Sequence, residues 1–427
     1  MSINSAAQEY KLYIGLICFC LFSFKGWTQS PNNKYQYPDF NGRVMAGYQG
    51  WFNTGSDGAE RGWHHYERRS KFEPGSSEID YWPDMREYKI KYPTDFKLSN
   101  GQTAQVFSSY DASTVNLHFK WMKQYGIDGV FMQRFIAEIR SASGMRHFNR
   151  VLSSAMSASR QYKRDICIMY DLSGMQPGEE LFLLKDLDRL TKQYGLLETG
   201  GKTSPYYLHY RDKPLIAVWG VGFNDHRAYG FKQARIIIDG LKKRGFSIML
   251  GVPTYWRELG SDAIKDTTLH ALLTDCDIVA PWFVGRYDQK SYPLFKHLIQ
   301  EDITWCNAHH LGYVPLAFPG FSWKNMNGPN SREIARNRGA FFWQQIAGAK
   351  QAGAKMLYIA MFDEMNEGTS IFKVATKSGV PGNGDGSFHG IDDDLGSDYY
   401  LWLTGQARRW FGGTNPKAYS DALPQRK

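Results

Sequence analysis

The sequence lacks several features that mark whole classes of protein. It has only 5 cysteines in 427 residues, which is too few for a disulfide scaffold. It contains no CxxC or HExxH spacing and no GxGxxG fingerprint, the common signatures of zinc sites and dinucleotide-binding sheets. Its 51 basic residues exceed its 42 acidic ones, but no long basic run concentrates that charge. We therefore expect no metal, no cofactor and no nucleic acid partner.

Long apolar runs are also scarce, and the N-terminus holds the clearest one, from Leu12 to Phe24 after the basic Lys11. This run has the length of the apolar part of a signal peptide and is short for a membrane span, which takes about 20 residues. We predict a signal peptide over residues 1–28, an exported protein (periplasmic, cell-surface or secreted) and no stable membrane span. The alternative is a short N-terminal membrane anchor. The remaining cysteines adjoin apolar runs and are expected to be buried free thiols: Cys167, Cys276 and Cys306.

Aromatic residues, in contrast, are abundant. They make up 15% of the chain, with 13 Trp, 26 Tyr and 26 Phe. Hydrophobic residues reach 42% and charged residues 22%, which permits a large core and excludes wholesale disorder. The aromatic rings therefore indicate either a large core or a surface that stacks on flat ligands such as sugars.

Apolar strands alternate with helical segments along the chain. We expect strands at residues 44–52, 128–135, 165–171, 214–219, 247–252, 278–283, 313–318 and 355–362. We expect helices at residues 113–125, 145–162, 179–194, 232–243, 262–273, 293–309, 333–351 and 397–410. This alternation predicts parallel strands with right-handed crossovers, and eight units fit a (β/α)8 TIM barrel in the α/β class. One domain then spans residues 29–427, with elaborated loops at the C-terminal face that include a long insertion at residues 53–105.

Barrel active sites lie at the C-terminal ends of the strands, so the residues that follow each strand matter most. Aromatic side chains recur there, together with planar polar ones. Sugars offer apolar C–H faces to aromatic rings and hydroxyls to polar partners, so we predict a sugar-binding rim. The alternative is that these aromatics pack the helix shell or the loop bases. The candidates are Tyr48, Trp51, His65, Arg134, Asp171, Trp219, Tyr255, Trp282 and Trp323.

Two of these candidates have specific alternatives. His65 contacts either sugar hydroxyls or a carboxylate, or it has only a structural role in a glycine-rich loop. Arg134 pairs either with Glu364 or Glu367 across the barrel mouth, or with the end of a helix.

The densest acidic feature follows the last strand, in the segment FDEMNEGT at residues 362–369. Glycoside hydrolysis commonly uses two carboxyl groups, one protonated and one ionised, and close like charges raise one pKa. Glu364 and Glu367 are three residues apart, so on a helical turn they share a face. Asp363 and Asn366 adjoin them as further candidates for substrate contact. The alternative is a solvated loop or a helix N-terminus that favours acids.

The motif Glu-x-x-Glu-Gly-Thr resembles the catalytic segment of glycoside hydrolase families 71 and 99, especially the endo-α-mannosidase family. Three further segments resemble the same proteins: VMAGYQGWF with the later GWHHY, SPYYLHYRDKPLIAVWG, and SDYYLWLTGQARRW. The segments are spread over about residues 44–411, and the Glu-x-x-Glu-Gly-Thr motif is the most specific of them. The resemblance implies a (β/α)8 barrel and a retaining, endo-acting hydrolase of α-linked sugars that needs no cofactor.

The resemblance also implies roles for the two glutamates. Glu364 acts as a base toward the sugar's own 2-hydroxyl, which gives an anhydro-sugar intermediate, and Glu367 acts as acid and then base at the glycosidic oxygen. The sequence departs from the family at Met365 and Asn366, where an aromatic residue and a His or Gly are usual. It also has Asp363 where Asn is usual, and Asp363 is either a further catalytic carboxylate or a group that orients Glu364.

The sequence thus predicts an exported, monomeric glycosidase of an α-linked oligosaccharide or polysaccharide. The alternative is a non-catalytic carbohydrate-binding protein on the same barrel. Residues 382–394 contain the oxygen-rich Asn383, Asp385 and Ser387, which suggest calcium. They lack the full pattern of a calcium loop, so a lid or a plain loop is favoured.

Overall fold

The computed structural model describes residues 38–197, 205–382, 388–413 and 419–426. The chain divides into two compact units, Met1–Gln36 and Tyr37–Lys427, and the described residues all belong to the second. The predicted signal peptide, residues 1–28, lies outside the described residues and stays a prediction. Within the described ranges, no helix is long and apolar enough to cross a bilayer.

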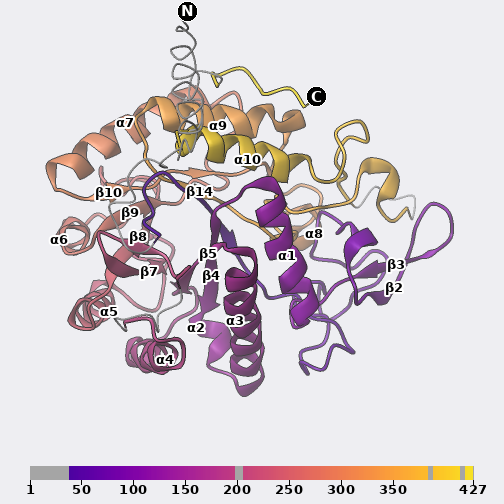
Figure 1. Cartoon of the computed structure of the whole chain (residues 1–427), viewed down its shortest axis with the longest axis horizontal. Helices are drawn as coiled ribbons and strands as arrows, with labels where there is room; N and C mark the ends of the chain where they lie inside the picture. Colours follow the sequence, from indigo (N-terminus) through magenta and orange to yellow (C-terminus); the bar gives the residue numbers. More distant parts are fainter. Residues whose placement is uncertain (1–37, 198–204, 383–387, 414–418, 427) are drawn as a thin grey trace, which may run out of the picture. The chain divides into compact units, whose positions relative to one another are not determined.

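A curved parallel sheet forms the centre of the second unit (Figure 1). Its strands follow the order β10-β9-β8-β7-β5-β4-β1-β14-β11, and all neighbours along this path are parallel. The strands are β1 (Val44–Tyr48), β4 (Gly129–Phe135), β5 (Asp165–Asp171), β7 (Lys213–Trp219), β8 (Ser247–Val252), β9 (Ile278–Pro281), β10 (Gly312–Tyr313), β11 (Leu316–Ala317) and β14 (Leu357–Ile359).

The sheet closes through one short segment. The strands at the two ends of the path, β10 and β11, are separated only by Val314 and Pro315. Val314 donates its N–H to Val279 on β9 (3.0 Å), and the Pro315 carbonyl accepts from Tyr358 on β14 (3.0 Å). Pro315 has no N–H to donate, which fits a break in the ladder at this point. The predicted seventh strand is therefore present in two pieces, and the predicted (β/α)8 barrel is confirmed.

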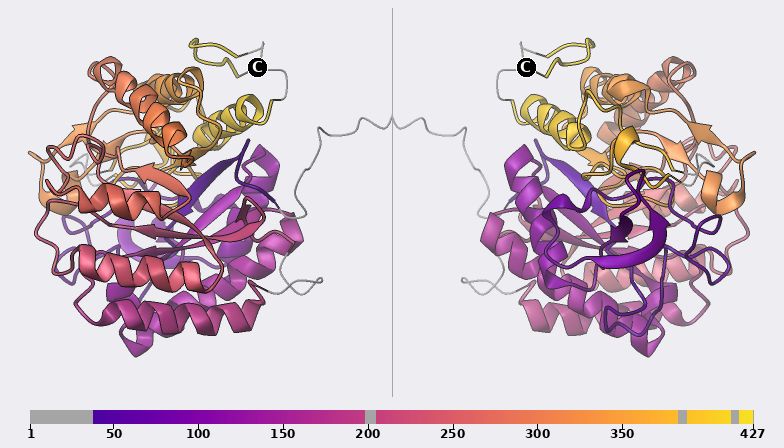
Figure 2. Two further views of the ribbon diagram at one scale, coloured as in Figure 1. Left: turned by 90° about the vertical axis from the view of Figure 1, so that its left-hand side faces the viewer. Right: turned by 90° about the vertical axis from the view of Figure 1, so that its right-hand side faces the viewer.

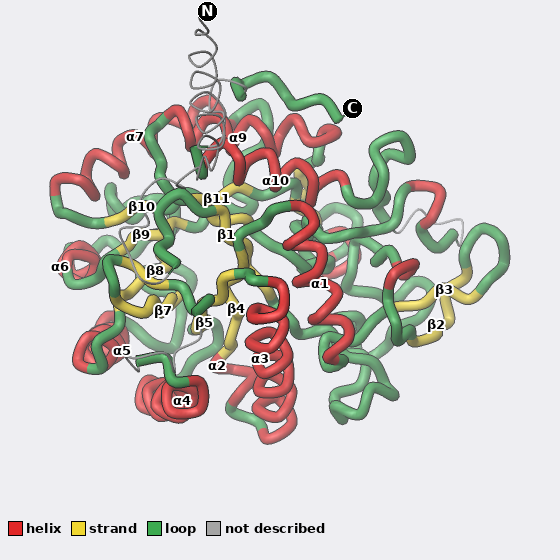
Figure 3. Tube along the Cα trace, viewed as in Figure 1, coloured by secondary structure: helices red, strands yellow, loops and turns green. Residues whose placement is uncertain are grey.

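Helices follow the strands in turn and lie around the outside of the sheet (Figure 3). The main ones are α1 (Ala112–Tyr125), α3 (Ala142–Tyr162), α4 (Glu179–Tyr194), α5 (Phe231–Lys243), α6 (Thr268–Thr274), α7 (Tyr292–Ala308), α9 (Ala340–Gln351) and α10 (Tyr399–Phe411). The shorter elements are α2 (Ile136–Ile139), α8 (Lys324–Asn327), β6 (His209–Tyr210), β12 (Phe321–Ser322), β13 (Glu333–Ile334), η1 (Met85–Glu87), η2 (Asn337–Gly339) and η3 (Lys377–Gly379).

Two helices begin later than predicted. The segment predicted as a helix from residue 262 starts at Thr268, because the Asp262 carboxylate instead accepts the N–H groups of Thr254 and Tyr255 (both 3.1 Å). The helix predicted from residue 333 starts at Ala340. The left-handed φ angles of Arg338 (53°) and Gly339 (87°) separate it from the preceding chain.

The predicted insertion at residues 53–105 packs beside the barrel, where β2 (Tyr92–Lys97) and β3 (Thr103–Val106) form an antiparallel hairpin. Figure 2 (right) turns this side of the molecule toward the viewer. Buried rings fill its interior, among them Phe72, Trp82 and Phe96, whose centroids lie 5.0–5.9 Å apart. Part of the aromatic excess is therefore core packing. The three cysteines are buried free thiols, as predicted.

Candidate active site at the carboxyl end of the barrel

The acidic segment after β14 is tied to the end of β1. Phe362 donates its N–H to the Gly47 carbonyl (2.7 Å), so the chain stays in contact with β1 beyond β14 itself. The next residue, Asp363, accepts the N–H groups of Gln49 (2.8 Å) and Gly50 (2.9 Å), one on each carboxylate oxygen. These bonds hold the first and last strands together where the candidate glutamates begin.

Glu364 is held at both of its carboxyl oxygens. Oε1 accepts the Gln49 side-chain amide (2.9 Å), and Oε2 accepts the Thr369 hydroxyl (3.0 Å). The residue is buried. Two donors at one carboxyl favour its ionised form and fix its orientation.

Burial gives this segment unusual electrostatics. Burial, together with the charge of Glu367, raises the pKa of Glu364 well above its ordinary value. Burial also raises the pKa of Glu367 to about 7, Asp171 adds to this effect, and an interaction with the Trp323 indole opposes it. Burial raises the pKa of Asp363 to about 7 as well. In the described part of the chain, no Lys or Arg forms an ion pair with these carboxyls.

Burial and the repulsion between the two glutamates thus both favour a proton on one of them. A carboxyl group with a pKa near the working pH can both give and accept a proton in one catalytic cycle. Because each charge opposes the other, protonation of one glutamate eases the ionisation of its partner. This arrangement suits general acid–base chemistry.

Several predicted rim residues lie near this pair or beside one another. Asp171, at the end of β5, acts on the pKa of Glu367, as does Trp323. Trp219 ends β7 and Trp282 follows β9, and across the intervening β8 their rings meet edge to face, with centroids 5.3 Å apart. Asn366 is buried and Tyr255 is partly exposed in the loop after β8.

Trp51 and His65 form a stacked pair in the loops after β1. Their ring centroids are 3.8 Å apart with the planes 15° from parallel, and Trp51 also stacks on Phe135 at the end of β4 (5.0 Å). The Nε2 atom of His65 lies 3.8 Å from a carboxylate oxygen of Glu138. Of the contacts predicted for His65, the structure shows the one with a carboxylate, that of Glu138.

Two predicted rim residues point away from the barrel mouth, and the prediction for them is wrong. Tyr48 is fully buried and bonds the Nδ1 atom of His118 on α1 (2.8 Å). Arg134 is 2% exposed and donates to Asp186 on α4 (2.8 Å), so it pairs with a helix and with neither glutamate.

Strand geometry explains both errors, because successive side chains on a strand point to opposite faces. Gln133 faces the barrel interior, where its amide donates to Tyr358 (3.2 Å), so Arg134 faces outward. Gly47 also faces inward, close to the Tyr358 hydroxyl, so Tyr48 faces outward.

Asp363 also differs from its prediction as a residue that contacts substrate. It is 0% exposed, and both of its oxygens accept backbone N–H groups. Its place fits the other prediction, that it orients Glu364, because the backbone it holds is that of Gln49. Gln49 and Thr369 are absent from the predicted site. Gln49 directly follows a strand, so the rule that barrel sites lie at strand ends could have selected it. Thr369 could be identified only from the fold of the turn that brings it back to Glu364.

The prediction that residues 382–394 form a lid or a plain loop and not a calcium site stays a prediction. Asn383, Asp385 and Ser387 lie outside the described residues. In the same stretch, Asp392 pairs with Lys377, and Asp394 pairs with Arg338. These carboxylates already have protein partners.

Comparisons with known proteins agree with the fold. Neither a protein-family model nor a curated protein matches the sequence. Among solved structures, the GH99 endo-α-mannosidase from Bacteroides thetaiotaomicron has a TM-score of 0.62 at 15% identity, covering 88% of this chain and 99% of that one. The same enzyme in complex with bis-tris propane has a TM-score of 0.59 at 15% identity, covering 87% and 98%. The predicted resemblance is thus confirmed at the level of the fold, a parallel (β/α)8 barrel.

Proposed function

We propose that the protein is a glycoside hydrolase that cleaves α-linked glycans internally and with retention, as the GH99 endo-α-mannosidase resemblance implies. The observation that carries the proposal is the pair of coupled glutamates, Glu364 and Glu367, directly after the last barrel strand. Burial raises the pKa of both.

The environments of the two glutamates support different roles. Glu364 receives hydrogen bonds from Gln49 and Thr369, both of which stabilise a carboxylate. The proton belongs to the pair and not to one residue, and the proposed cycle uses the form in which Glu367 holds it. In that form Glu367 no longer repels the Glu364 carboxylate, which acts as the base toward the sugar 2-hydroxyl. Glu367, with a pKa raised to about 7, then gives its proton to the glycosidic oxygen and later recovers one from water.

The aromatic rim supports a sugar as the ligand. Trp219, Trp282 and Trp323 are each partly exposed, and they lie at the end of β7, directly after β9 and in the segment after β11. Indole faces pack against the C–H faces of pyranose rings, and Asp171 lies close enough to Glu367 to affect its pKa. Such a rim would hold several sugar units along the mouth, which fits internal cleavage.

The second candidate is a carbohydrate-binding protein without catalysis. It would be favoured if structural ion pairs capped the two glutamates. Within the described ranges neither glutamate has such a pair, which favours the enzyme.

The test is a screen of the purified protein against α-mannans, α-glucans and complex heteroglycans, analysed by mass spectrometry of the products. We expect oligosaccharide products from wild type and none from Glu367→Gln. Glu180→Gln serves as the matched control, because Glu180 is buried on α4. Tight binding to a glycan with no product from wild type would favour the binding protein.

We also propose export and a monomeric state. Export predicts a mature protein that begins near Gln29, which N-terminal sequencing of the secreted material can check. Light scattering should give the mass of one chain.

A further inference from the structure

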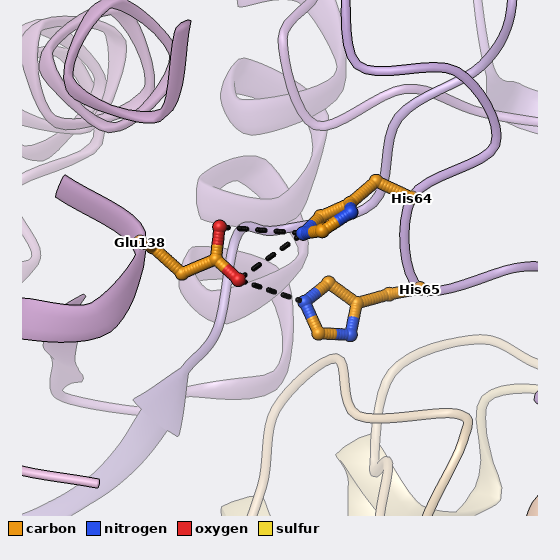
Figure 4. A group of neighbouring side chains, drawn as sticks. All are labelled: His64, His65 and Glu138. Atoms are coloured by element: carbon orange, nitrogen blue, oxygen red, sulfur yellow. Dashed lines mark hydrogen bonds and ion pairs between the residues drawn. The ribbon is translucent and has the colours of Figure 1, made fainter. Parts of the chain in front are cut away.

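A second group of polar side chains lies outside the glutamate pair, between the loop after β1 and the segment after β4. His64 and His65 come from the loop, and Glu138 comes from α2 (Figure 4). The Nε2 atom of His64 lies 3.1 Å and 3.3 Å from the two Glu138 oxygens, and Nε2 of His65 lies 3.8 Å from the carboxylate. One ligand atom from each residue lies within 4.8 Å of the other two.

We propose that His64, His65 and Glu138 form a binding site for a divalent transition metal of the zinc type. Zinc binds imidazole nitrogen and carboxylate oxygen at about 2.0–2.1 Å, and a tetrahedral arrangement then separates the ligand atoms by about 3.3 Å. The two histidine–glutamate spacings, 3.1 Å and 3.8 Å, lie on either side of this value. Two imidazoles and one carboxylate suit zinc, cobalt or nickel better than calcium or magnesium, which prefer oxygen ligands alone.

The conformation of His65 supports this proposal. Its buried Nε2 atom has no hydrogen-bond partner within the described ranges. Its φ angle is 62°, in the left-handed region that residues other than glycine rarely adopt. The stack on Trp51 at 3.8 Å holds the imidazole plane in place. Packing and an uncommon backbone conformation thus direct a nitrogen without a hydrogen bond toward Glu138.

Arg61 gives the competing explanation. Its guanidinium donates to Glu138, so Arg61, His64 and His65 could simply surround one carboxylate as an ion-pair network. That network accounts for Glu138 but leaves the Nε2 of His65 without a hydrogen bond. With a metal bound, Arg61 becomes the outer partner that orients the ligating carboxylate, a common arrangement around metal ligands.

The site lies near the protein surface. The side chains of His64, His65 and Glu138 are 31%, 19% and 23% exposed. A bound ion would join the loop after β1 to α2. It would thereby fix Trp51, which stacks on His65.

The test uses tag-free, chelator-treated protein titrated with Zn²⁺ by calorimetry and with Co²⁺ by visible absorption. We expect one equivalent of metal, and a cobalt spectrum typical of low coordination number. H64A/H65A and E138Q should each weaken binding by at least 100-fold. H309A/H310A is the matched control, because His309 and His310 are also adjacent and exposed, and it should bind as wild type does.

Circular dichroism separates loss of the site from loss of the fold, and the single variant H64A provides a second measurement if the double variant unfolds. Zinc should also raise the unfolding temperature of wild type and of H309A/H310A, but not that of E138Q. Equal binding by wild type and H64A/H65A would overturn the proposal, as would the absence of binding at micromolar metal. Either result would leave the ion-pair network as the explanation.

Discussion

The barrel carries carboxylates that are buried or little exposed at both ends, and their surroundings differ. At the amino end, Asp128 accepts the Val44 N–H (2.9 Å) and the Arg408 guanidinium (3.0 Å), and Asp165 pairs with Arg43 (2.7 Å). At the carboxyl end, the structure gives no ion pair to Lys or Arg within the described ranges for Asp171, Asp363, Glu364 and Glu367. Strand β5 shows both cases, since it begins at Asp165 and ends at Asp171.

The difference lies in the cations and not in burial. Burial raises the pKa of Asp165 to about 7 even beside Arg43, and it also raises the pKa of Asp171. A carboxylate with a basic partner joins parts of the chain, whereas one without a basic partner lacks the interaction that offsets the cost of burying its charge. Buried carboxylates without a basic partner are typical of functional sites, which often lower the stability of the fold.

The largest expected effect is the loss of catalysis on substitution of the glutamates at the carboxyl end. Glu364→Gln and Glu367→Gln should each lower the turnover of a cleaved glycan by about 10²–10⁴-fold, because each removes a proton-transfer group. Asp128→Asn should leave turnover per folded molecule unchanged. Steady-state rates on the substrate found in the screen, corrected for the folded fraction, check this. The double glutamate variant should be little worse than the poorer single one, and additive losses would show that the two do not act together.

Substitutions of the carboxylates at the amino end should instead lower the free energy of unfolding. Asp128→Ala leaves the buried Val44 N–H without its acceptor and removes the partner of Arg408. We expect a loss of about 3 kcal/mol in the free energy of unfolding, measured by urea denaturation. A loss below about 0.5 kcal/mol would mean that the network contributes no more than ordinary surface pairs.

A smaller effect should come from the group that holds Glu364. Gln49→Leu removes the amide that donates to Glu364 while keeping similar volume. We expect kcat to fall by about tenfold with little change in KM, since Gln49 positions Glu364 and favours its ionised form. The acidic limb of the pH–rate profile should move to higher pH. An unchanged profile with a raised KM would instead make Gln49 a substrate contact.

These residues also show how far the sequence predicts the structure. The alternation of apolar strands and helices is a strong periodic signal, and the barrel follows from it. The acidic segment at residues 362–369 could be placed at the mouth because barrel sites lie at strand ends. Tyr48 and Arg134 were misplaced because knowing where a strand ends to within one residue does not tell which face a side chain occupies.

Contacts between distant segments are harder to predict. Asp363 and Gln49 meet because the last strand pairs with the first, and no local sequence pattern predicts that contact. Glu138 and His64 are likewise 74 positions apart, so the search for metal motifs at short spacing could not find them. The helix predicted from residue 262 begins late because the Asp262 carboxylate accepts backbone N–H groups of the preceding loop. Asp side chains commonly form such bonds in place of a helical turn.

A carboxyl-to-amide substitution should change the stability of the fold in opposite directions at the two ends of the barrel. Burial raises the pKa of Glu367 to about 7, above the value of about 4.5 in an unfolded chain, so between these values the folded protein binds more protons. This group therefore costs stability as pH rises from about 4.5 to 7, and the full cost is present above 7.

Glu367→Gln removes this cost, so we expect it to stabilise the fold by about 1–2 kcal/mol at pH 8 and to have no effect at pH 4. The figure is smaller than the full pKa shift would give because the Glu367 side chain is partly exposed. Asp128→Asn should destabilise at pH 8, because it removes a partnered charge. Thermal unfolding of both variants at the two pH values measures the signs, and destabilisation by Glu367→Gln at pH 8 would mean that Glu367 is a structural carboxylate like those at the amino end.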